Sequence, residues 1–138
     1  MTLLIVGAGL AGSAAFESAR ELGVNAVVVD TRSCRPVSVR EGRLAVAEDG
    51  FVRGVDARAV ILATGAGKTS EPQLAIAKAL GCRTAYDRLL RHERLVLESG
   101  GETSIRGVFA AGGASERDAV ESGRRAGAAA AARVGKSS

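Results

Sequence analysis

Short apolar runs and longer segments of small residues alternate along this chain, with glycines between them. Residues 3–6 (LLIV) form an apolar run that leads directly into a glycine-rich turn. Residues 10–22 follow as small and apolar residues typical of a helix, which ends at Gly23. A second apolar run, residues 25–30, is rich in valine and typical of a strand buried on both faces. This order predicts a βαβ unit with two adjacent parallel strands.

The middle of the chain shows a different pattern. Three short runs, residues 37–40, 43–48 and 51–55, are separated by the dipeptides EG and DG, which favour tight turns between antiparallel strands. We therefore expect a small β-hairpin or meander inserted into the βαβ pattern.

The remaining segments return to longer helices and buried strands. Residues 59–65 and 107–113 predict two further core strands, and residues 94–98 are a weaker candidate strand. Residues 71–81 predict a short helix, and residues 116–135 a longer one with acids early and arginines later, as the helix dipole favours. The predicted fold class is α/β, a Rossmann-like parallel sheet with a small β-hairpin or meander insertion.

Composition narrows the classes of protein. With 138 residues, 46% of them hydrophobic, we expect a single domain over residues 1–138. No apolar run approaches the ~18 residues of a membrane span and no secretory leader precedes residue 3, so we expect a cytoplasmic protein. The net charge is +4 but the basic residues are scattered, and aromatic residues make up only 3%, so we expect no nucleic-acid partner. Cys34 and Cys82 form no C-x-x-C motif and predict buried free thiols rather than a metal site.

The first glycines carry the clearest chemistry. Gly7, Gly9 and Gly12 fit G-x-G-x-x-G between a predicted strand and a predicted helix. In that pattern Gly7 permits the tight turn, Gly9 leaves room for a pyrophosphate, and Gly12 lets the helix pack closely. The turn through Leu10 and Ala11 then offers free backbone N–H groups to the phosphates. A tight turn without a ligand is the alternative.

An acid should follow the second strand to bind the ribose hydroxyls. Asp30 stands 18 residues after Gly12, close to the expected spacing of about 20. Thr31 and Arg32 follow it. Arg32 could stack on adenine, receive a 2′-phosphate, or remain a solvated loop residue.

Two later stretches resemble flavoproteins that have two dinucleotide-binding domains. The end of AVILATG resembles their A-T-G segment, which places Ala63, Thr64 and Gly65 near the cofactor. TSIRGVFAAGG, residues 103–113, resembles their C-terminal flavin motif. The residues that fit this motif are Thr103, Val108, Phe109, Ala110, Ala111 and Gly112.

Residues 70–87 resemble a narrower group, the FAD-containing subunits of hydrogen cyanide synthase, opine oxidase, heterotetrameric sarcosine oxidase and dye-linked proline dehydrogenases. The residues that match in kind are Pro72, Leu74, Ala75, Leu80, Gly81, Cys82, Tyr86 and Asp87. The resemblance implies an FAD-binding subunit of a heteromeric amino-acid dehydrogenase or oxidase, with a larger flavoprotein as partner. A homo-oligomer is left open.

This chain departs from that group in two ways. Its members are longer and contain a second dinucleotide domain, whereas only one glycine loop occurs here. Gly113 also replaces the aspartate that holds the ribityl–phosphate part of the flavin in the family. The backbone N–H groups of Gly113 and Ala114, at the start of the last helix, could still face a phosphate. FAD is therefore the implied cofactor, with NAD or another ADP-containing nucleotide as the alternative.

No residue stands out as catalytic. His92 lies in a charged segment, Ser70 and Ser115 lack a nucleophile motif, and Lys68 lacks the first glycine of a P-loop. We therefore assign no catalytic residue and place the chemistry on a partner chain. A small free-standing FAD- or NAD-dependent oxidoreductase and a cofactor-free scaffold subunit are the alternatives.

Overall fold

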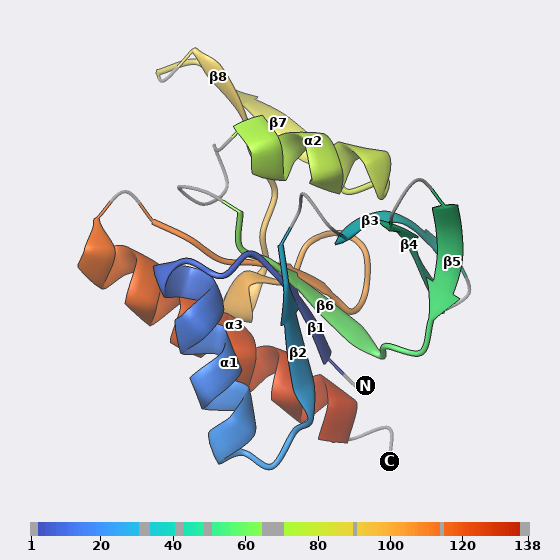
Figure 1. The fold of residues 1–138 in the computed structure, drawn as a ribbon. Helices are drawn as coiled ribbons and strands as arrows, with labels where there is room; N and C mark the ends of the chain where they lie inside the picture. Colours follow the sequence, from blue (N-terminus) through green and yellow to red (C-terminus); the bar gives the residue numbers. More distant parts are fainter. Residues whose placement is uncertain are drawn as a thin grey trace.

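The computed structural model contains a four-stranded parallel sheet at its centre, in the order β2-β1-β6-β9 (Figure 1). The model describes residues 3–30, 34–40, 43–48, 51–64, 71–89, 91–113 and 115–135. The strands of the central sheet are β1 (Leu3–Val6), β2 (Ala26–Val29), β6 (Ala59–Leu62) and β9 (Val108–Ala110). β1 pairs in parallel with β2 on one side and β6 on the other, so the predicted Rossmann-like α/β fold and the adjacent first two strands are confirmed.

Two helices cover one face of this sheet. They are α1 (Leu10–Glu21) and α3 (Glu116–Gly135), which lie side by side (Figure 1). Successive residues of a strand point to opposite faces. Leu3 and Ile5 accordingly join Phe109 in a buried cluster with the alanines of both helices. We call this side the helix face.

The opposite face is covered by the inserted sheet and a short helix. The inserted sheet is an antiparallel meander of β3 (Cys34–Arg40), β4 (Arg43–Glu48) and β5 (Phe51–Val55), as predicted. β3 begins at residue 34 rather than 37, and its register with β4 shifts between Pro36 and Ser38. The helix is α2 (Glu71–Ala79). We call this side the meander face.

Bulky aliphatic side chains fill the meander face. Leu4 and Val6 of β1 pack there in one cluster with Leu44 and Val46 of β4 and Leu74 of α2. The predicted meander therefore forms part of the hydrophobic core, because its side chains cover one face of the central sheet.

Two predictions about strands are wrong. β2 was expected to be buried on both faces, but it lies at the edge of the sheet, where Val27 is 38% exposed. The candidate strand at 94–98 is instead β8 (His92–Leu95), which pairs antiparallel with an unpredicted strand, β7 (Thr84–Asp87). Leu95 alone among the eight strand residues of this hairpin is buried, so little apolar pattern marks it.

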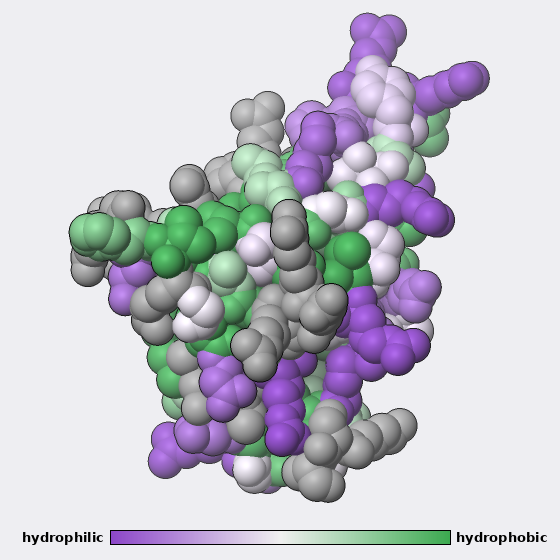
Figure 2. Space-filling view, turned by 90° about the vertical axis from the view of Figure 1, so that its right-hand side faces the viewer, coloured by the Kyte–Doolittle hydropathy of each residue, from purple (hydrophilic) through white to green (hydrophobic). Residues whose placement is uncertain are grey.

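Two smaller elements remain, a short 3-10 turn and the hairpin β7–β8. The 3-10 turn, η1 (Ser99–Gly101), comes after β8 in the chain. The hairpin β7–β8 projects from the top of the molecule, and Figure 2 shows mainly hydrophilic side chains on that projection. Within the described part of the chain, no helix combines the length and apolar character needed to cross a membrane.

Cys82 is a buried free thiol, as predicted. Burial raises the pKa of its thiol, against the smaller opposing effect of the hydrogen bond that its Sγ donates to Thr103 Oγ1 at 3.4 Å. Cys82 and Thr103 lie far from the glycine turn in the sequence, so neither effect concerns that turn.

Candidate nucleotide-binding site

The turn between β1 and α1 is held firmly at its start. The Gly7 N–H donates to the Val29 carbonyl at 2.8 Å, and the Ala63 N–H donates to the Val6 carbonyl at 2.8 Å. These bonds bring the carboxyl ends of three neighbouring strands together at one edge of the sheet. In open parallel sheets, ligands bind beside the carboxyl ends of the strands, at the point where the strand order reverses.

Two glycines of the turn are required by contacts within the protein. Gly7 has φ +115°, and a side chain there would overlap the carbonyl oxygen of Ala63. A side chain at Gly12 would overlap the carbonyl oxygen of Gly7. Both glycines therefore let α1 approach the sheet closely, as the G-x-G-x-x-G pattern predicts.

Gly9 is different from its two neighbours. It stands at the N-cap of α1 in an extended conformation (φ −77°, ψ −162°), and a Cβ built on it would meet no atom within 4 Å. No contact with the described residues thus calls for a glycine at this position.

The amino end of α1 is open to an anion. No side chain caps it, and its first turn contains no acidic residue. The first N–H groups of a helix have no partner within the helix, and the helix dipole places positive potential there. Such an end suits a phosphate group.

A cavity of about 410 Å³ lies over this turn. Its walls come from the first turn of α1, the ends of β2 and β6, and the start of α3. The residues that line it are Gly7, Ala8, Gly9, Leu10, Ala11, Asp30, Ala63, Thr64 and Ala119. Asp30 carries the single ionisable side chain among these described lining residues, and it is exposed at the end of β2.

Seven of the fourteen predicted site residues therefore line one cavity. Ala8 and Ala119 also line it and were not predicted. Ala8 is a variable position of the glycine motif. Ala119 belongs to α3, and nothing in the local sequence marks an alanine in that helix as a neighbour of the first turn.

Four of the predicted site residues, Thr31, Arg32, Gly65 and Ala114, lie outside the described residues. Their assignments remain predictions.

Gly112 and Gly113, which follow β9, are not among the residues that line this cavity. Gly112 has φ +144°, and its N–H donates to Ser122 Oγ at 3.1 Å. A Cβ built on Gly113 would lie 2.5 Å from the Cβ of Asp118 and 2.8 Å from its carbonyl carbon. Gly113 is thus packed against the first turn of α3, which leaves no space for the aspartate that the flavin motif has at this position.

A buried amide group joins the ends of two strands beside the cavity. Gln73 of α2 is 0% exposed. Its Oε1 accepts the Thr64 N–H at 2.7 Å and the Thr64 hydroxyl at 3.0 Å, and its Nε2 donates to the Ala111 carbonyl at 3.1 Å. Gln73 therefore holds Thr64, a lining residue, in a defined place relative to β9. The sequence pattern of α2 did not mark this residue.

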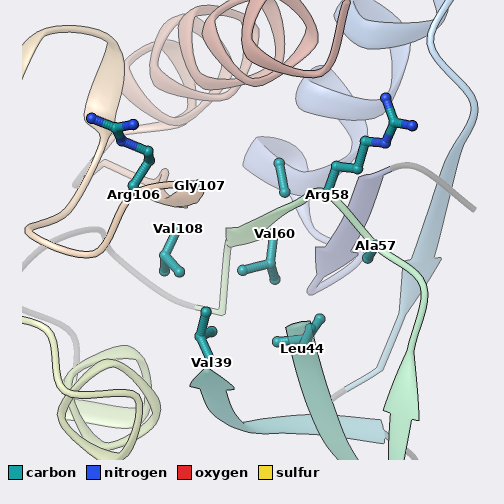
Figure 3. Close-up of a pocket in the computed structure, with 9 residues that line it drawn as sticks. Val39, Leu44, Ala57, Arg58, Val60, Arg106, Gly107 and Val108 are labelled. Atoms are coloured by element: carbon teal, nitrogen blue, oxygen red, sulfur yellow. The ribbon is translucent and has the colours of Figure 1, made fainter. Parts of the chain in front are cut away.

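A second, much smaller cavity lies at the opposite edge of the sheet (Figure 3). Its volume is about 30 Å³, and its walls are mainly the aliphatic side chains of Val39, Leu44 and Val60. The side chains of Arg58 and Arg106 point away from it in Figure 3. A space of this size holds about one water molecule, so it is a packing defect rather than a ligand site.

A third, open cavity of about 580 Å³ lies between α2 and the hairpin β7–β8. Lys78 Nζ donates to Glu93 at 2.8 Å, and this bond together with one from Thr84 lowers the pKa of Glu93. His92 Nδ1 lies 2.6 Å from the Glu93 carbonyl. Lys78 and Glu93 pair with each other here, and this cavity shares no lining residue with the cavity over the glycine turn.

The chain therefore has a Rossmann-like fold, and its open glycine turn has the geometry of a dinucleotide-binding turn. No model of a known protein family matches this sequence, and no curated protein matches it. Solved structures share its fold. The atypical thioredoxin reductase TRi from Desulfovibrio vulgaris Hildenborough is 16% identical, with a TM-score of 0.67 over 98% of both chains.

Two further solved structures have similar folds. An oxidoreductase from Agrobacterium tumefaciens is 15% identical, with a TM-score of 0.65 over 94% of this chain and 97% of that chain. A ferredoxin-flavin thioredoxin reductase from Clostridium acetobutylicum is 11% identical, with a TM-score of 0.58 over 98% of this chain and 97% of that chain. At these identities the likeness is one of fold.

Proposed function

We propose that this chain is the dinucleotide-binding domain of a flavin- or nicotinamide-dependent oxidoreductase. The turn from Gly7 to Gly12 would bind the pyrophosphate, and Asp30 would bind the adenosine ribose. One observation carries this proposal: Gly7 and Gly12 are required by the protein's own backbone, whereas the Cβ direction of Gly9 is empty. A ligand phosphate at that place explains the third glycine.

The named relatives in fold support the oxidoreductase class. Two are thioredoxin reductases, and one of these two is a ferredoxin-flavin enzyme. A bound flavin or nicotinamide would supply hydride or electron transfer. The described residues of this chain would bind and orient the nucleotide through backbone N–H groups and one carboxylate.

The resemblance of residues 70–87 favours a more specific role, that of a subunit in a heteromeric amino-acid dehydrogenase or oxidase of the proline type. The described lining of the site supports this, because Asp30 is its single ionisable group and no acid–base pair accompanies it. Dye-linked oxidation of proline should therefore require a larger flavoprotein partner. Turnover of proline by the purified chain alone would contradict the subunit role.

Gly9→Val tests the nucleotide site itself. The branched side chain would enter the space proposed for the pyrophosphate, so ADP affinity should fall by about a hundredfold or more, equivalent to roughly 2.8 kcal/mol. Thermal unfolding should change little, because no atom of the described residues lies in that space. Gly54→Val in β5 is the matched control, since its Cβ direction is also empty and it lies outside the cavity lining. Equal ADP affinity in both variants would reject the proposal.

A further inference from the structure

Two strand–glycine–helix connections reach the same edge of the sheet, and they differ in what they offer a ligand. The first leads from β1 into α1 and the second from β9 into α3. In the resembled flavoproteins the second connection contacts the flavin half of FAD. The contacts around Gly113 do not fit that role here.

The space at the second connection is filled by the protein. A side chain on Gly113 would lie 2.5 Å from the Asp118 Cβ and 2.9 Å from the Ala119 backbone nitrogen. Real Cβ atoms are essentially never found this close to such neighbours without a shift of the backbone. At Gly9 the corresponding space is empty. The first turn of α3 therefore occupies the volume that the first turn of α1 leaves open.

Three backbone N–H groups at the second connection are already used. Gly112 N–H donates to Ser122 Oγ at 3.1 Å, and Asp118 N–H donates to Ser115 Oγ at 3.1 Å. The Ala119 N–H donates to the Ser115 carbonyl at 3.0 Å. A phosphate or ribityl group arriving here would have to displace bonds within the protein. No such side-chain cap exists at α1.

The charges at the two helix starts also favour an anionic ligand at α1 over one at α3. The first turn of α3 contains Glu116 and Asp118, both exposed, whereas the first turn of α1 contains no acid. Carboxylates are favourable neighbours for the amino end of a helix, but they repel a phosphate that approaches it. The positive end of α3 is thus neutralised by its own residues.

From these contrasts we infer that the site recognises the ADP half of its ligand, and that the β9–α3 connection does not hold the flavin or nicotinamide half. This inference rests on the proposed nucleotide site and sharpens it. The affinity for ADP should then account for the affinity for any ADP-containing dinucleotide, and a flavin should add little.

Calorimetric titration of the full chain with ADP, NAD and FAD tests the inference. The three dissociation constants should agree within about threefold, a difference below 1 kcal/mol. FAD binding about tenfold or more tighter than ADP would overturn the inference while leaving the nucleotide site intact. Absence of ADP binding would instead overturn the proposed function, and the inference with it.

A pair of variants tests the role of the two carboxylates. The double variant Glu116→Gln/Asp118→Asn removes their charge, and it should strengthen FAD binding more than ADP binding. Glu121→Gln, further along the same helix, is the matched control and should leave the ratio of the two affinities unchanged. An unchanged ratio in the double variant would contradict the assignment of the repulsion to Glu116 and Asp118.

Discussion

The two faces of the central sheet are packed by opposite means. On the helix face, α1 and α3 approach so closely that a side chain at Gly123 would overlap the Ala11 carbonyl oxygen, and one at Gly127 would lie 2.5 Å from the Ala15 carbonyl oxygen. On the meander face, large side chains such as Leu44 and Leu74 fill the space between layers. Replacing a large side chain by a small one should therefore destabilise the meander face. Adding a side chain at one of the glycines should destabilise the helix face.

The difference bears on the site because only the helix face touches it directly. Ala11 both lines the cavity and lies against Gly123, so α3 supports the back of the turn that is open at Gly9. The hydroxyl of Ser18 donates to the Arg124 carbonyl at 2.9 Å and ties the same two helices together further along. Protein interiors are close-packed and transmit such displacements. The helix face should therefore couple stability to binding. On the meander face the aliphatic contacts should not, and the expected link to the site is the Gln73 amide, which holds Thr64.

The largest expected effect is on the meander face. Leu44→Ala removes a side chain that is 4% exposed and enlarges the apolar cavity at the far edge of the sheet (Figure 3). We expect a loss of about 2–5 kcal/mol in the free energy of unfolding, measured in urea. ADP affinity of the folded protein should be unchanged, because this cavity lies opposite the glycine turn.

The control for that experiment is Phe51→Ala in the same meander. Phe51 is 76% exposed, so its removal should cost little. A large loss of ADP affinity in Leu44→Ala would show that the meander face is also coupled to the site, and it would break the comparison.

The next largest effect concerns the helix face, where side-chain volume is added rather than removed. Gly123→Ala adds one methyl group against the backbone of Ala11, and overpacking of this kind costs about 1–3 kcal/mol in unfolding free energy. ADP affinity should fall as well, because α1 must move to make room. Gly135→Ala in the same helix, where an added Cβ meets no atom within 4 Å, should be neutral or slightly stabilising. Equal unfolding curves for the two variants would contradict close packing between α1 and α3.

Local patterns predicted the parts of the molecule that depend on local geometry. The glycine turn, Asp30 after the second strand and the three meander strands follow from residue order and turn chemistry, and the structure places them as expected. The edge position of β2 was missed because a run of valines does not say how many neighbours a strand has. It pairs with β1 alone in the described sheet.

The missed site residues depend on how distant elements pack. Ala119 reaches the cavity because α3 crosses the sheet at one particular distance from α1. That distance is set by Gly123 and Gly127, whose role is visible only once the two helices are placed together. Gln73 was missed for the same reason, since its partners Thr64 and Ala111 end two different strands.

The smallest of the three effects tests a polar connection between α2 and the ends of β6 and β9. Gln73→Leu keeps a similar side-chain volume but removes the three hydrogen bonds that join Thr64 to Ala111 through the amide. Each such bond contributes about 0.5–1.5 kcal/mol net, and water can reach the half-buried Thr64, so the expected loss in unfolding free energy is roughly 1–2 kcal/mol. Because Thr64 lines the cavity, ADP affinity should fall slightly but less than in Gly123→Ala. Gln73→Met serves as a second apolar variant with a flexible side chain, which separates loss of the hydrogen bonds from poor packing of leucine. If both variants unfold at the wild-type urea concentration, the amide does not hold the strand ends together, and the meander face is secured by its aliphatic contacts alone.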